Sequence, residues 1–534
     1  MWKAPLAGRS AVSVAEASCS GWLSARRILT FDPSACGNSI WWEAGRIRAV
    51  GDAAELGRLV PRGTPAFELP DSLVTPGFVD GHTHFAMWAL NRRRVQLAGS
   101  LTREEALSRV AASAPVQGWV IGQGWDANGW LRSPDRGALD GVHRVPVYLD
   151  SLDVHAAWVN SAALAAAGIT RHTPDPFGGR IVRDAAGEPT GLLLERAVEL
   201  MAPHLPQPPA HLLDLALREA QAEAHTLGIT GIHDVEGDAA LAAFERLAGA
   251  DALRLRVLFH PPVTSLTDLV RRSVRSGSGG PWLRIGGIKM FLDGSLGSRT
   301  AWMLEPYAGT RDRGMPITAE AEAAGALRTA AGSGLAATVH AIGDAAVRRA
   351  LDLMAALPRV GIPHRIEHFQ CVHPADLERA AAAGIVASMQ PAHLLTDIPL
   401  VERYWGARGR GAYAFESLRR LGTPLVFGSD VPVASLDPRE GLYAALERRT
   451  DTGLPAGGWQ LDEKLSFDSA VGAYTVGPAF AGGVGERSGA LAPGRDADLV
   501  AWSFDAAAER GDGAAVRAGR ARLTVVRGEV VMQR

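Results

Sequence analysis

Two histidines near the start of this sequence have a spacing that suits a metal ion. His82 and His84 lie in the segment DGHTH, at the end of an apolar run. Because side chains alternate across a β-strand, two histidines separated by one residue point the same way. Two converging imidazoles can bind zinc or a similar ion, although a pair of structural histidines in a loop could have the same spacing. The segment therefore has two interpretations, a metal site or a pair of structural histidines.

Three further candidate ligands end later apolar runs. His340 ends ATVH and His368 ends RIEH, in two consecutive runs. One histidine on a strand is more often a packing residue, but a pair that ends neighbouring strands is harder to explain by packing. Asp430 ends FGSD, and a carboxylate beside a metal can both bind the ion and take a proton from bound water. Its alternative role is to cap the turn that follows.

Lys289 is unusual because it lies inside the apolar segment GGIKMFLDG. Only three of the 55 basic residues are lysines, so this position is expected to require an amine. Burial lowers the pKa of a lysine and leaves a neutral, nucleophilic amine. Such an amine can form a Schiff base, or take up carbon dioxide to become a carbamate that bridges two metals. A salt bridge to Asp293 or to another acid is the alternative, since an unpaired buried ammonium is costly.

The elements that would position these residues are short apolar runs alternating with longer helical segments, a pattern that predicts a parallel sheet covered by helices. The runs that qualify as strands are residues 73–80, 228–235, 253–260, 285–292, 335–342, 364–370, 385–391 and 423–430. Eight strands with helical crossovers predict an α/β fold, a (β/α)8 TIM barrel with its catalytic residues at the carboxyl ends of the strands. The candidate ligands would then share one rim.

Parts of the chain lie outside the predicted barrel, which we assign to residues 73–482. An insertion at about 86–225 carries two strand-like runs, GWVIGQGW and VPVYLD. The flanks, residues 21–72 and 483–534, are β-like. Because neither flank can bury a core alone, we expect them to pair in one small composite β-sandwich domain. Residues 1–20 are expected to be disordered.

Composition excludes several classes of function. The chain has 534 residues, of which 47% are hydrophobic and 21% charged, as in globular proteins. A net charge of −2 provides no field that would attract nucleic acid or anionic lipid. The three cysteines are scattered, which favours a reducing compartment. No apolar run approaches the roughly 20 residues of a membrane span, and the start does not resemble a signal peptide, so we expect a cytoplasmic protein.

The same candidate ligands lie in segments that resemble the amidohydrolase superfamily of metal-dependent hydrolases. The opening PGFVDGHTH and the closing GALAPGRDADLVAW are similar to the two ends of that family. Within it, the chain resembles the amidohydrolase-3 branch of YtcJ-like proteins, which includes N-substituted formamide deformylase. The segments that carry this closer resemblance are GWVIGQGWD, HAAWVNSAAL, KMFLDGSLGSRTA, HAIGDAAV, RIEHFQ, SMQPAHLLTD and FGSDVPV.

The resemblance implies a distorted barrel, a composite β domain built from both termini, and one or two divalent metals, zinc being expected. It implies His82 and His84 on one metal and His340 and His368 on the other, with a carbamylated Lys289 between them. Asp430 would be both ligand and general base. The implied reaction is the hydrolysis of a C–N bond of the amide type, N-formyl or N-acyl, by metal-activated hydroxide.

Residues for substrate binding are predicted from the insertion and from two loops. The insertion is expected to overhang the rim, and its candidates for the wall of the pocket are Trp125, Asp126, His155 and Trp158. His393, just beyond the seventh strand, could stabilise an oxyanion or orient substrate. Arg299 is a substrate-binding candidate that could also pair with Asp293. Packing, turn formation or capping is the alternative role for each of these side chains.

Several alternative functions have to be weighed against an amidohydrolase. A single-metal deaminase of the same superfamily would need an acid near His340, where only Asp344 is available. A hydrolase of cyclic amides or lactones is close in chemistry. A Schiff-base lyase could use Lys289 but leaves the rim histidines without a role, and a binding protein would be expected to lack the ligands. The expected partner is a small-molecule amide; the oligomeric state is open, with a homodimer as one option.

Overall fold

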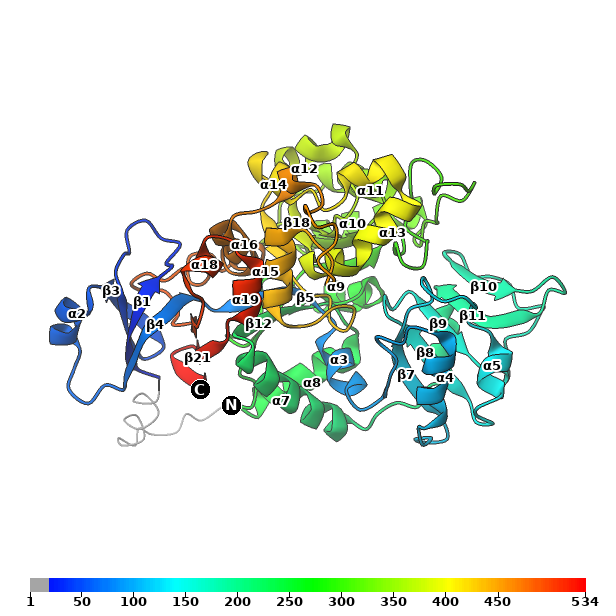
Figure 1. Ribbon diagram of the computed structural model, residues 1–534, viewed down its shortest axis with the longest axis horizontal. Coiled ribbons are helices and arrows are strands. Elements are labelled where there is room, and N and C mark those ends of the chain that lie inside the picture. Colours follow the sequence, from blue (N-terminus) through cyan, green and yellow to red (C-terminus); the bar gives the residue numbers. More distant parts are fainter. Residues whose placement is uncertain (1–18) are drawn as a thin grey trace.

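The computed structural model describes residues 19–534, whose strands form four sheets. Most of the N-terminal extension expected to be disordered lies outside the described residues. Two parallel sheets and their helices form the middle of the molecule in Figure 1. A six-stranded sheet lies at one end and a seven-stranded sheet at the other. Among residues 19–534, no helix combines the length and apolarity needed to cross a membrane.

The parallel strands follow the orders β14-β13-β12-β5 and β15-β16-β17-β18-β19. Their bounds are β5 (Phe78–Thr83), β12 (Ile229–Asp234), β13 (Arg256–Phe259), β14 (Leu283–Ile285), β15 (Ile288–Phe291), β16 (Ala337–Ala341), β17 (Arg365–His368), β18 (Val386–Met389) and β19 (Leu425–Phe427). Each of the eight strand segments predicted from the sequence overlaps one of these strands. The predicted α/β class with parallel sheets is therefore confirmed.

The two parallel sheets are joined by backbone contacts on both sides. Thr83, at the end of β5, forms a parallel bridge with Val431, and the Asp430 amide donates to the carbonyl of His82 at 2.7 Å. On the other side the Lys289 amide donates to the carbonyl of Pro261 at 2.8 Å. The carboxyl end of β5 consequently lies beside the residues that follow β19, which brings His82 and Asp430 together.

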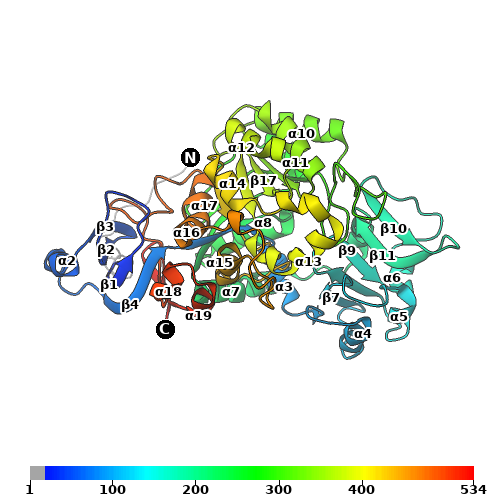
Figure 2. The same cartoon turned by 45° about the horizontal axis from the view of Figure 1, so that its top comes forward.

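Helices cover the outer faces of the parallel strands (Figure 2). In α11, the buried Val347, Leu351 and Met354 recur at helical spacing and form one apolar stripe. The helices of this layer are α7 (Ala210–Thr226), α8 (Asp238–Gly249), α9 (Leu266–Arg271), α10 (Glu320–Gly332), α11 (Asp344–Ala355), α12 (Leu377–Ala383), α13 (Leu394–Tyr404), α14 (Phe415–Arg420), α15 (Pro438–Glu447), α16 (Phe467–Tyr474) and α17 (Val476–Ala481).

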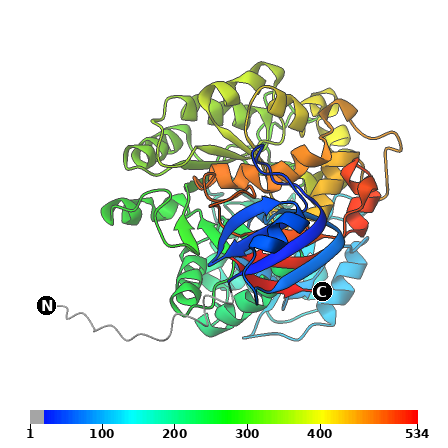
Figure 3. The same cartoon turned by 90° about the vertical axis from the view of Figure 1, so that its left-hand side faces the viewer.

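The seven-stranded sheet joins the two ends of the chain, as the blue and red strands of Figure 3 show. Its central strand β4 pairs with β1 in parallel and with β20 antiparallel. Residues 73–76, which the sequence analysis placed in the first barrel strand, belong to β4. The elements of this region are β1 (Gly21–Ile28), β2 (Ser39–Glu43), β3 (Arg46–Gly51), α2 (Ala53–Leu59), β4 (Ala66–Pro76), β20 (Leu499–Trp502), α18 (Ala506–Glu509), α19 (Gly513–Ala518), β21 (Ala521–Val526) and β22 (Glu529–Gln533).

The insertion after β5 folds around the sheet β10-β11-β9-β8-β7-β6. Its two predicted strands correspond to β7 and β8, and the remaining four were missed because they are short or interrupted by polar residues. The elements are α3 (Phe85–Asn91), β6 (Val95–Gln96), α4 (Arg103–Ala111), β7 (Val120–Trp125), α5 (Arg136–Asp140), β8 (Val147–Ser151), β9 (Ala156–Val159), α6 (Ser161–Ala166), β10 (Gly179–Arg183) and β11 (Pro189–Glu195).

Candidate metal centre

Asp430 lies at the centre of a group of four imidazoles. Its Oδ1 atom is 3.4 Å from Nε2 of His82 and 3.3 Å from Nε2 of His84. Its Oδ2 atom is 4.0 Å from Nδ1 of His368 and 3.9 Å from Nε2 of His393. The two carboxylate oxygens therefore face two different pairs of histidines, and each pair with Asp430 forms a group compact enough to hold a metal ion.

The imidazole of His84 is free for this site because other groups cap the helix that it precedes. His84 occupies the N-cap position of α3 but makes no capping hydrogen bond with its side chain. Asp234, at the end of β12, accepts from the amide of Phe85 at 2.8 Å, and Glu236 accepts from the next two amides at 2.7 Å. These carboxylates satisfy the exposed amides of the helix end, so the histidine does not have to.

Asp80 fastens the two sides of the site to each other. Its Oδ1 atom accepts from the amide of His82 at 3.1 Å and from that of Ser429 at 2.9 Å. Just beyond Ser429, Asp430 has a φ of 58°, and His368 has a φ of 68°. Left-handed backbone at residues other than glycine is uncommon and is held in place by surrounding contacts. Here it turns both side chains toward the histidine group.

His82 is held by a buried carboxylate that sequence analysis did not single out. Its Nδ1 atom contacts Glu367 in a very short hydrogen bond, and both side chains are fully buried. Arg365 donates to the same carboxylate, to the carbonyl of Gly81 at 2.6 Å and to the hydroxyl of Ser388 at 2.6 Å. Burial raises the pKa of Glu367, but Arg365 and His82 outweigh burial and hold the pKa well below its usual value. The Nε2 atom of His82 is left for a ligand.

Lys289 projects from β15 toward the same group and has no ion pair in the part of the chain that the structure describes. Its Nζ atom is 3.4 Å from Nε2 of His82 and 4.7 Å from the centre of the Phe291 ring. Burial lowers the pKa of Lys289 to about 8. Asp293, the partner considered in the sequence analysis, instead accepts from the amides of Ile342 and Gly343. The salt-bridge alternative is therefore not what the structure has.

His340 lies beside the site but is oriented differently from the other histidines. Its ring centre is 4.4 Å from that of His368, while its Nε2 atom is 3.1 Å from the carbonyl of Gly294. The compact group around Oδ2 of Asp430 consequently contains His393 where the sequence analysis expected His340. A role for His340 as a ligand stays a prediction.

The nitrogen and oxygen atoms of the group are better suited to binding a cation than to hydrogen bonding with one another. Three buried atoms of the group have no hydrogen-bond partner within residues 19–534: Nδ1 of His368, Nε2 of His393 and Oδ1 of Asp430. Nδ1 of the neighbouring His340 is also without a partner there. Buried polar atoms are normally paired, so an unpaired set that converges on one place needs an explanation. Imidazole nitrogens and carboxylate oxygens are the ligands that zinc and similar ions prefer.

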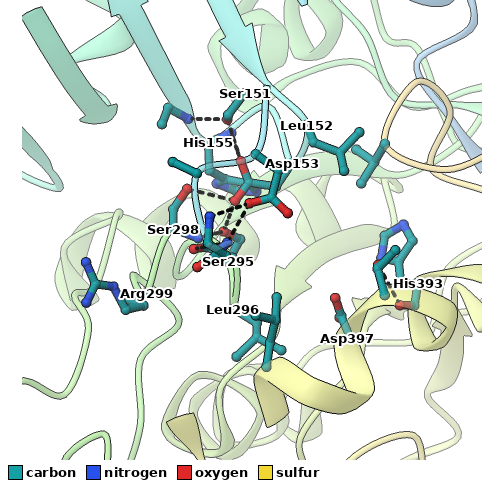
Figure 4. Close-up of a pocket in the computed structure, with 18 of the residues that line it drawn as sticks. Ser151, Leu152, Asp153, His155, Ser295, Leu296, Ser298, Arg299, His393 and Asp397 are labelled. Carbon is teal, nitrogen blue, oxygen red and sulfur yellow. Dashed lines mark hydrogen bonds between the residues drawn. The ribbon is translucent and has the colours of Figure 1, made fainter. Parts of the chain in front are cut away.

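A cavity of about 1100 Å³ opens over this group, between the insertion and the loops after the parallel strands. Figure 4 shows Asp153 of the insertion hydrogen-bonded to Ser295 and Ser298 of the loop after β15. The hydroxyls of Ser295 and Ser298 donate to Oδ2 of Asp153 at 2.6 and 2.7 Å. These hydrogen bonds fasten the insertion to the loop after β15.

Most of the residues predicted for substrate binding line this cavity: Trp125, Asp126, His155, Arg299 and His393. Trp158 does not; it is fully buried in the core of the insertion and donates to the carbonyl of Asp135 at 2.9 Å. Arg299 does not pair with Asp293, and its guanidinium lies 5.8 Å from the centre of the Tyr404 ring. For Trp158 the packing alternative is therefore the correct one.

Sequence analysis missed the carboxylates that orient the histidines. Glu367 contacts His82, and Glu195 accepts from Thr300 and lies 2.8 Å from Nδ1 of His155. For Glu367 a signal was available, because strand alternation places it on the same side as Arg365 in RIEH. Two opposite charges inside an apolar run are expected to pair, since an unpaired buried charge is costly. Glu195 offers no such signal, since its partner lies in another part of the insertion.

Comparison with known proteins identifies the family. The model of the amidohydrolase family matches residues 67–532, which is most of the chain. The chain therefore belongs to this family, and with it to the superfamily of metal-dependent amidohydrolases. The resemblance expected from the sequence segments is confirmed.

Three curated relatives cover nearly the whole chain. Protein LONG AFTER FAR-RED 3 of Arabidopsis thaliana is 33% identical over 86% of this chain and 82% of its own length. The putative amidohydrolase YtcJ of Bacillus subtilis is 32% identical over 93% of this chain and 96% of its own. The N-substituted formamide deformylase of Arthrobacter pascens is 28% identical, with coverage of 88% and 91%.

A solved structure shows the same fold over most of the chain. It belongs to an uncharacterized metal-dependent hydrolase from Pyrococcus horikoshii, 26% identical, with a TM-score of 0.75. The match covers 91% of this chain and 98% of that one.

Proposed function

We propose that this protein is a metal-dependent amidohydrolase that cleaves a C–N bond of the amide type, N-formyl or N-acyl, in a small molecule. The observation that carries the proposal is the position of Asp430, whose two oxygens face two pairs of imidazoles. The name of the Arthrobacter relative supports a formamide-type substrate. The parallel sheets support the distorted (β/α)8 barrel expected for such an enzyme.

The residues proposed to hold the metal are His82, His84 and Asp430 on one side, with His368 and His393 on the other. A divalent ion at such a site, zinc first among the candidates, supplies a water of lowered pKa and polarises a carbonyl. The chain itself fixes the geometry: Glu367 orients His82, and Asp80 ties its strand to the segment that carries Asp430. No rearrangement of the backbone is needed to complete the set.

Asp430 is proposed as the general base. Its Oδ1 atom has no hydrogen-bond partner within residues 19–534, so it can accept the proton of the attacking water. Burial raises the pKa of Asp430, but His82, His84 and His393 outweigh it and hold the pKa well below its usual value. The same oxygen then delivers the proton to the departing nitrogen, because an unprotonated amine is a very poor leaving group.

Lys289 is proposed to carry a carbamate. Its amine, with a pKa lowered to about 8, has a larger neutral fraction at neutral pH than an exposed lysine. The nitrogen lone pair forms a bond to the carbon of dissolved carbon dioxide, and the nitrogen releases one proton to water. The product is an anion beside His82, whose oxygens would replace a repelling ammonium with two ligand atoms.

The cavity supports a substrate with a bulky substituent. Its volume of about 1100 Å³ is large for a small-molecule site. A formyl group fills little of it, so the amine part of a formamide, or the acyl part of a longer amide, would occupy the remainder. Leu296, Leu395 and Tyr404 line the cavity and provide apolar contacts. His155 faces the same space and is proposed to orient the substrate.

The decisive experiment combines metal analysis with a single substitution. Metal content is measured by inductively coupled plasma mass spectrometry on protein purified without chelator, and turnover is measured on N-formyl and N-acyl amines. The Asp430→Asn variant should retain metal and lose about 10²- to 10⁴-fold in kcat, the usual contribution of a general base. Unchanged turnover in this variant would remove Asp430 from its role. Protein without metal, and without activity after addition of zinc, manganese or cobalt, would remove the proposed function.

A further inference from the structure

A second cavity lies outside the metal centre. It has a volume of about 650 Å³ and is bounded by α3, β6, the end of α4, β7 and residues 206–212, which lead into α7. None of its lining residues lines the cavity over the metal centre. Nothing in the proposed reaction uses this space, so its chemistry has to be considered separately.

The lining of the second cavity combines apolar walls with positive charge. The apolar walls include Leu90, Val95, Trp119, Ile121 and Leu212. The charged residues of the lining are Arg93, Arg94 and Arg109, and it contains no aspartate or glutamate. Such a lining is complementary to a ligand that has an apolar body and a negative group.

Arg94 differs from the other two arginines because it has no acidic partner. Arg93 donates to Glu219 at 2.8 Å, and Arg109 donates to Glu105 at 2.6 Å. The half-buried Arg94 makes no ion pair within the described chain, and its guanidinium donates at 2.8 Å to the Asn91 side chain. A guanidinium presents five donors in a planar fork, so most of its donors stay available.

The acidic group that acts most strongly on Arg94 is Asp150, which makes no direct salt bridge with it within the described chain. Tyr148 donates to Asp150 at 2.6 Å, so this carboxylate is already engaged on β8. Burial lowers the pKa of Arg94, which Asp150 and Tyr148 only partly offset. An arginine nevertheless stays charged in proteins. Because Asp150 offsets only part of the cost of burying this cation, an anionic ligand in direct contact with the guanidinium would stabilise it further.

The position of Arg94 is fixed from outside the cavity. Asn91, which accepts from Arg94, also contacts Gln123, and Gln123 donates to Gln96 at 3.0 Å. These amides join α3, β6 and β7 into one hydrogen-bonded network. A fixed donor loses little conformational entropy when a ligand binds.

We propose that the second cavity binds a small organic carboxylate with an apolar body, such as a medium-chain or aryl carboxylic acid, whose carboxylate contacts Arg94. The site is separate from the metal centre, and the inference does not depend on the proposed hydrolysis. Its occupant lies against Trp119 and Ile121, and its charged end lies toward α3.

The test uses the full-length protein and three probes of equal chain length in isothermal titration calorimetry. Octanoate is expected to bind, whereas octylamine and 1-octanol, which lack the negative charge, are expected to bind at least about tenfold more weakly. The Arg94→Met variant should lose about tenfold or more in octanoate affinity. Arg403→Met is the matched control, because Arg403 lines the cavity over the metal centre and also has no ion pair within the described chain.

A second variant keeps the test decisive if Arg94→Met folds poorly. Ala114 lies on the exposed rim of the second cavity, so Ala114→Trp fills the space and leaves Arg94 intact. Loss of octanoate binding in this variant, with normal binding in Arg403→Met, supports the site. Absence of octanoate binding to the unmodified protein overturns the proposal. So does equal affinity for octanoate and 1-octanol, or binding that is lost in Arg403→Met and kept in Ala114→Trp.

Discussion

Two couples of the same chemistry can be compared: His82 with Glu367 inside the candidate metal centre, and His155 with Glu195 at the wall of the cavity. In each, a carboxylate oxygen contacts Nδ1 of the imidazole. The first couple is fully buried between two core strands, and its residues are 285 positions apart. The second comes from the insertion, where the His155 side chain is 15% exposed to the cavity. The first histidine is a proposed metal ligand, and the second faces the cavity proposed to hold substrate.

The surroundings of the two couples shift the pKa values of their histidines in opposite directions. Burial and the positive charge of Lys289 lower the pKa of His82 to about 4, although Glu367 opposes them. Burial also acts to lower the pKa of His155, but Glu195 and Asp153 outweigh it and raise the pKa to about 9. An imidazole–carboxylate contact therefore does not by itself determine the charge of a histidine. The charged group beside the couple, Lys289 at His82 and Asp153 at His155, contributes to the direction of the pKa shift.

The largest expected effect on stability concerns Arg365, whose charge supports the buried couple of His82 and Glu367. Arg365→Met would leave Glu367 as an uncompensated buried carboxylate and should destabilise the protein by about 3–5 kcal/mol. Arg448→Met is the matched control, because Arg448 is as deeply buried but donates only to carbonyls such as those of Trp459 and Tyr413. Its loss should cost about 1–3 kcal/mol. Thermal unfolding of the two variants checks the order, and equal midpoints would contradict it.

The second expected effect separates the two couples by metal binding. Glu367→Gln keeps the size of the side chain but removes the charge that orients His82 and raises its basicity as a ligand. Removing such a partner typically weakens metal affinity about 10- to 100-fold. Glu195→Gln is the matched variant, because it changes the same kind of contact at His155, which we do not place on the metal. Its metal affinity should equal that of the unmodified protein.

Competition with a chromophoric chelator measures both affinities on folded protein. The comparison fails if both variants lose metal equally, since the two couples would then have the same role. It also fails if neither variant loses metal while the unmodified protein binds it. Circular dichroism of each variant shows that the measured affinity belongs to a folded chain.

The sequence predicted the parts of this architecture that depend on local pattern. The predicted strands were found because a buried parallel strand is a continuous apolar run, although β14 and β15 were predicted together as the single strand 285–292. His82, Lys289, His340 and His368 were recognised because each interrupts or ends such a run, where a polar residue needs a reason. The strand β6, with only the two residues Val95–Gln96, has no such pattern and was missed.

Features that depend on distant contacts could not be predicted from the pattern. The grouping of His393 with His368 and Asp430 brings together residues from three separate segments, which no local pattern indicates. Trp158 is of a residue type common in binding pockets. Only the packing of β9 against α5 shows that its side chain is buried in the insertion. The sequence analysis also started the first barrel strand too early, although the Pro76-Gly77 pair inside LVTPGFVD lies where β4 ends and β5 begins.

The smallest expected effect on stability concerns Thr300, which links the couple of His155 and Glu195 to the loop after β15. Its hydroxyl donates to Glu195 and accepts from the amide of Ser295 at 3.0 Å. Thr300→Val keeps the shape of the side chain but leaves a buried carboxylate oxygen and a buried amide without this partner. Such a loss costs about 1–3 kcal/mol, and the lower end is expected because Glu195 keeps its contact with His155.

The Thr300→Val variant also tests how far the two couples are independent. Metal affinity should stay unchanged, because His82 and Glu367 share no hydrogen bond with Thr300, whereas KM for an amide substrate should rise as His155 loses a fixed partner. Thermal unfolding, chelator competition and steady-state kinetics on the same preparation give the three values. A fall in metal affinity would mean that the insertion helps to hold the metal, and that the couples act as one network across the cavity.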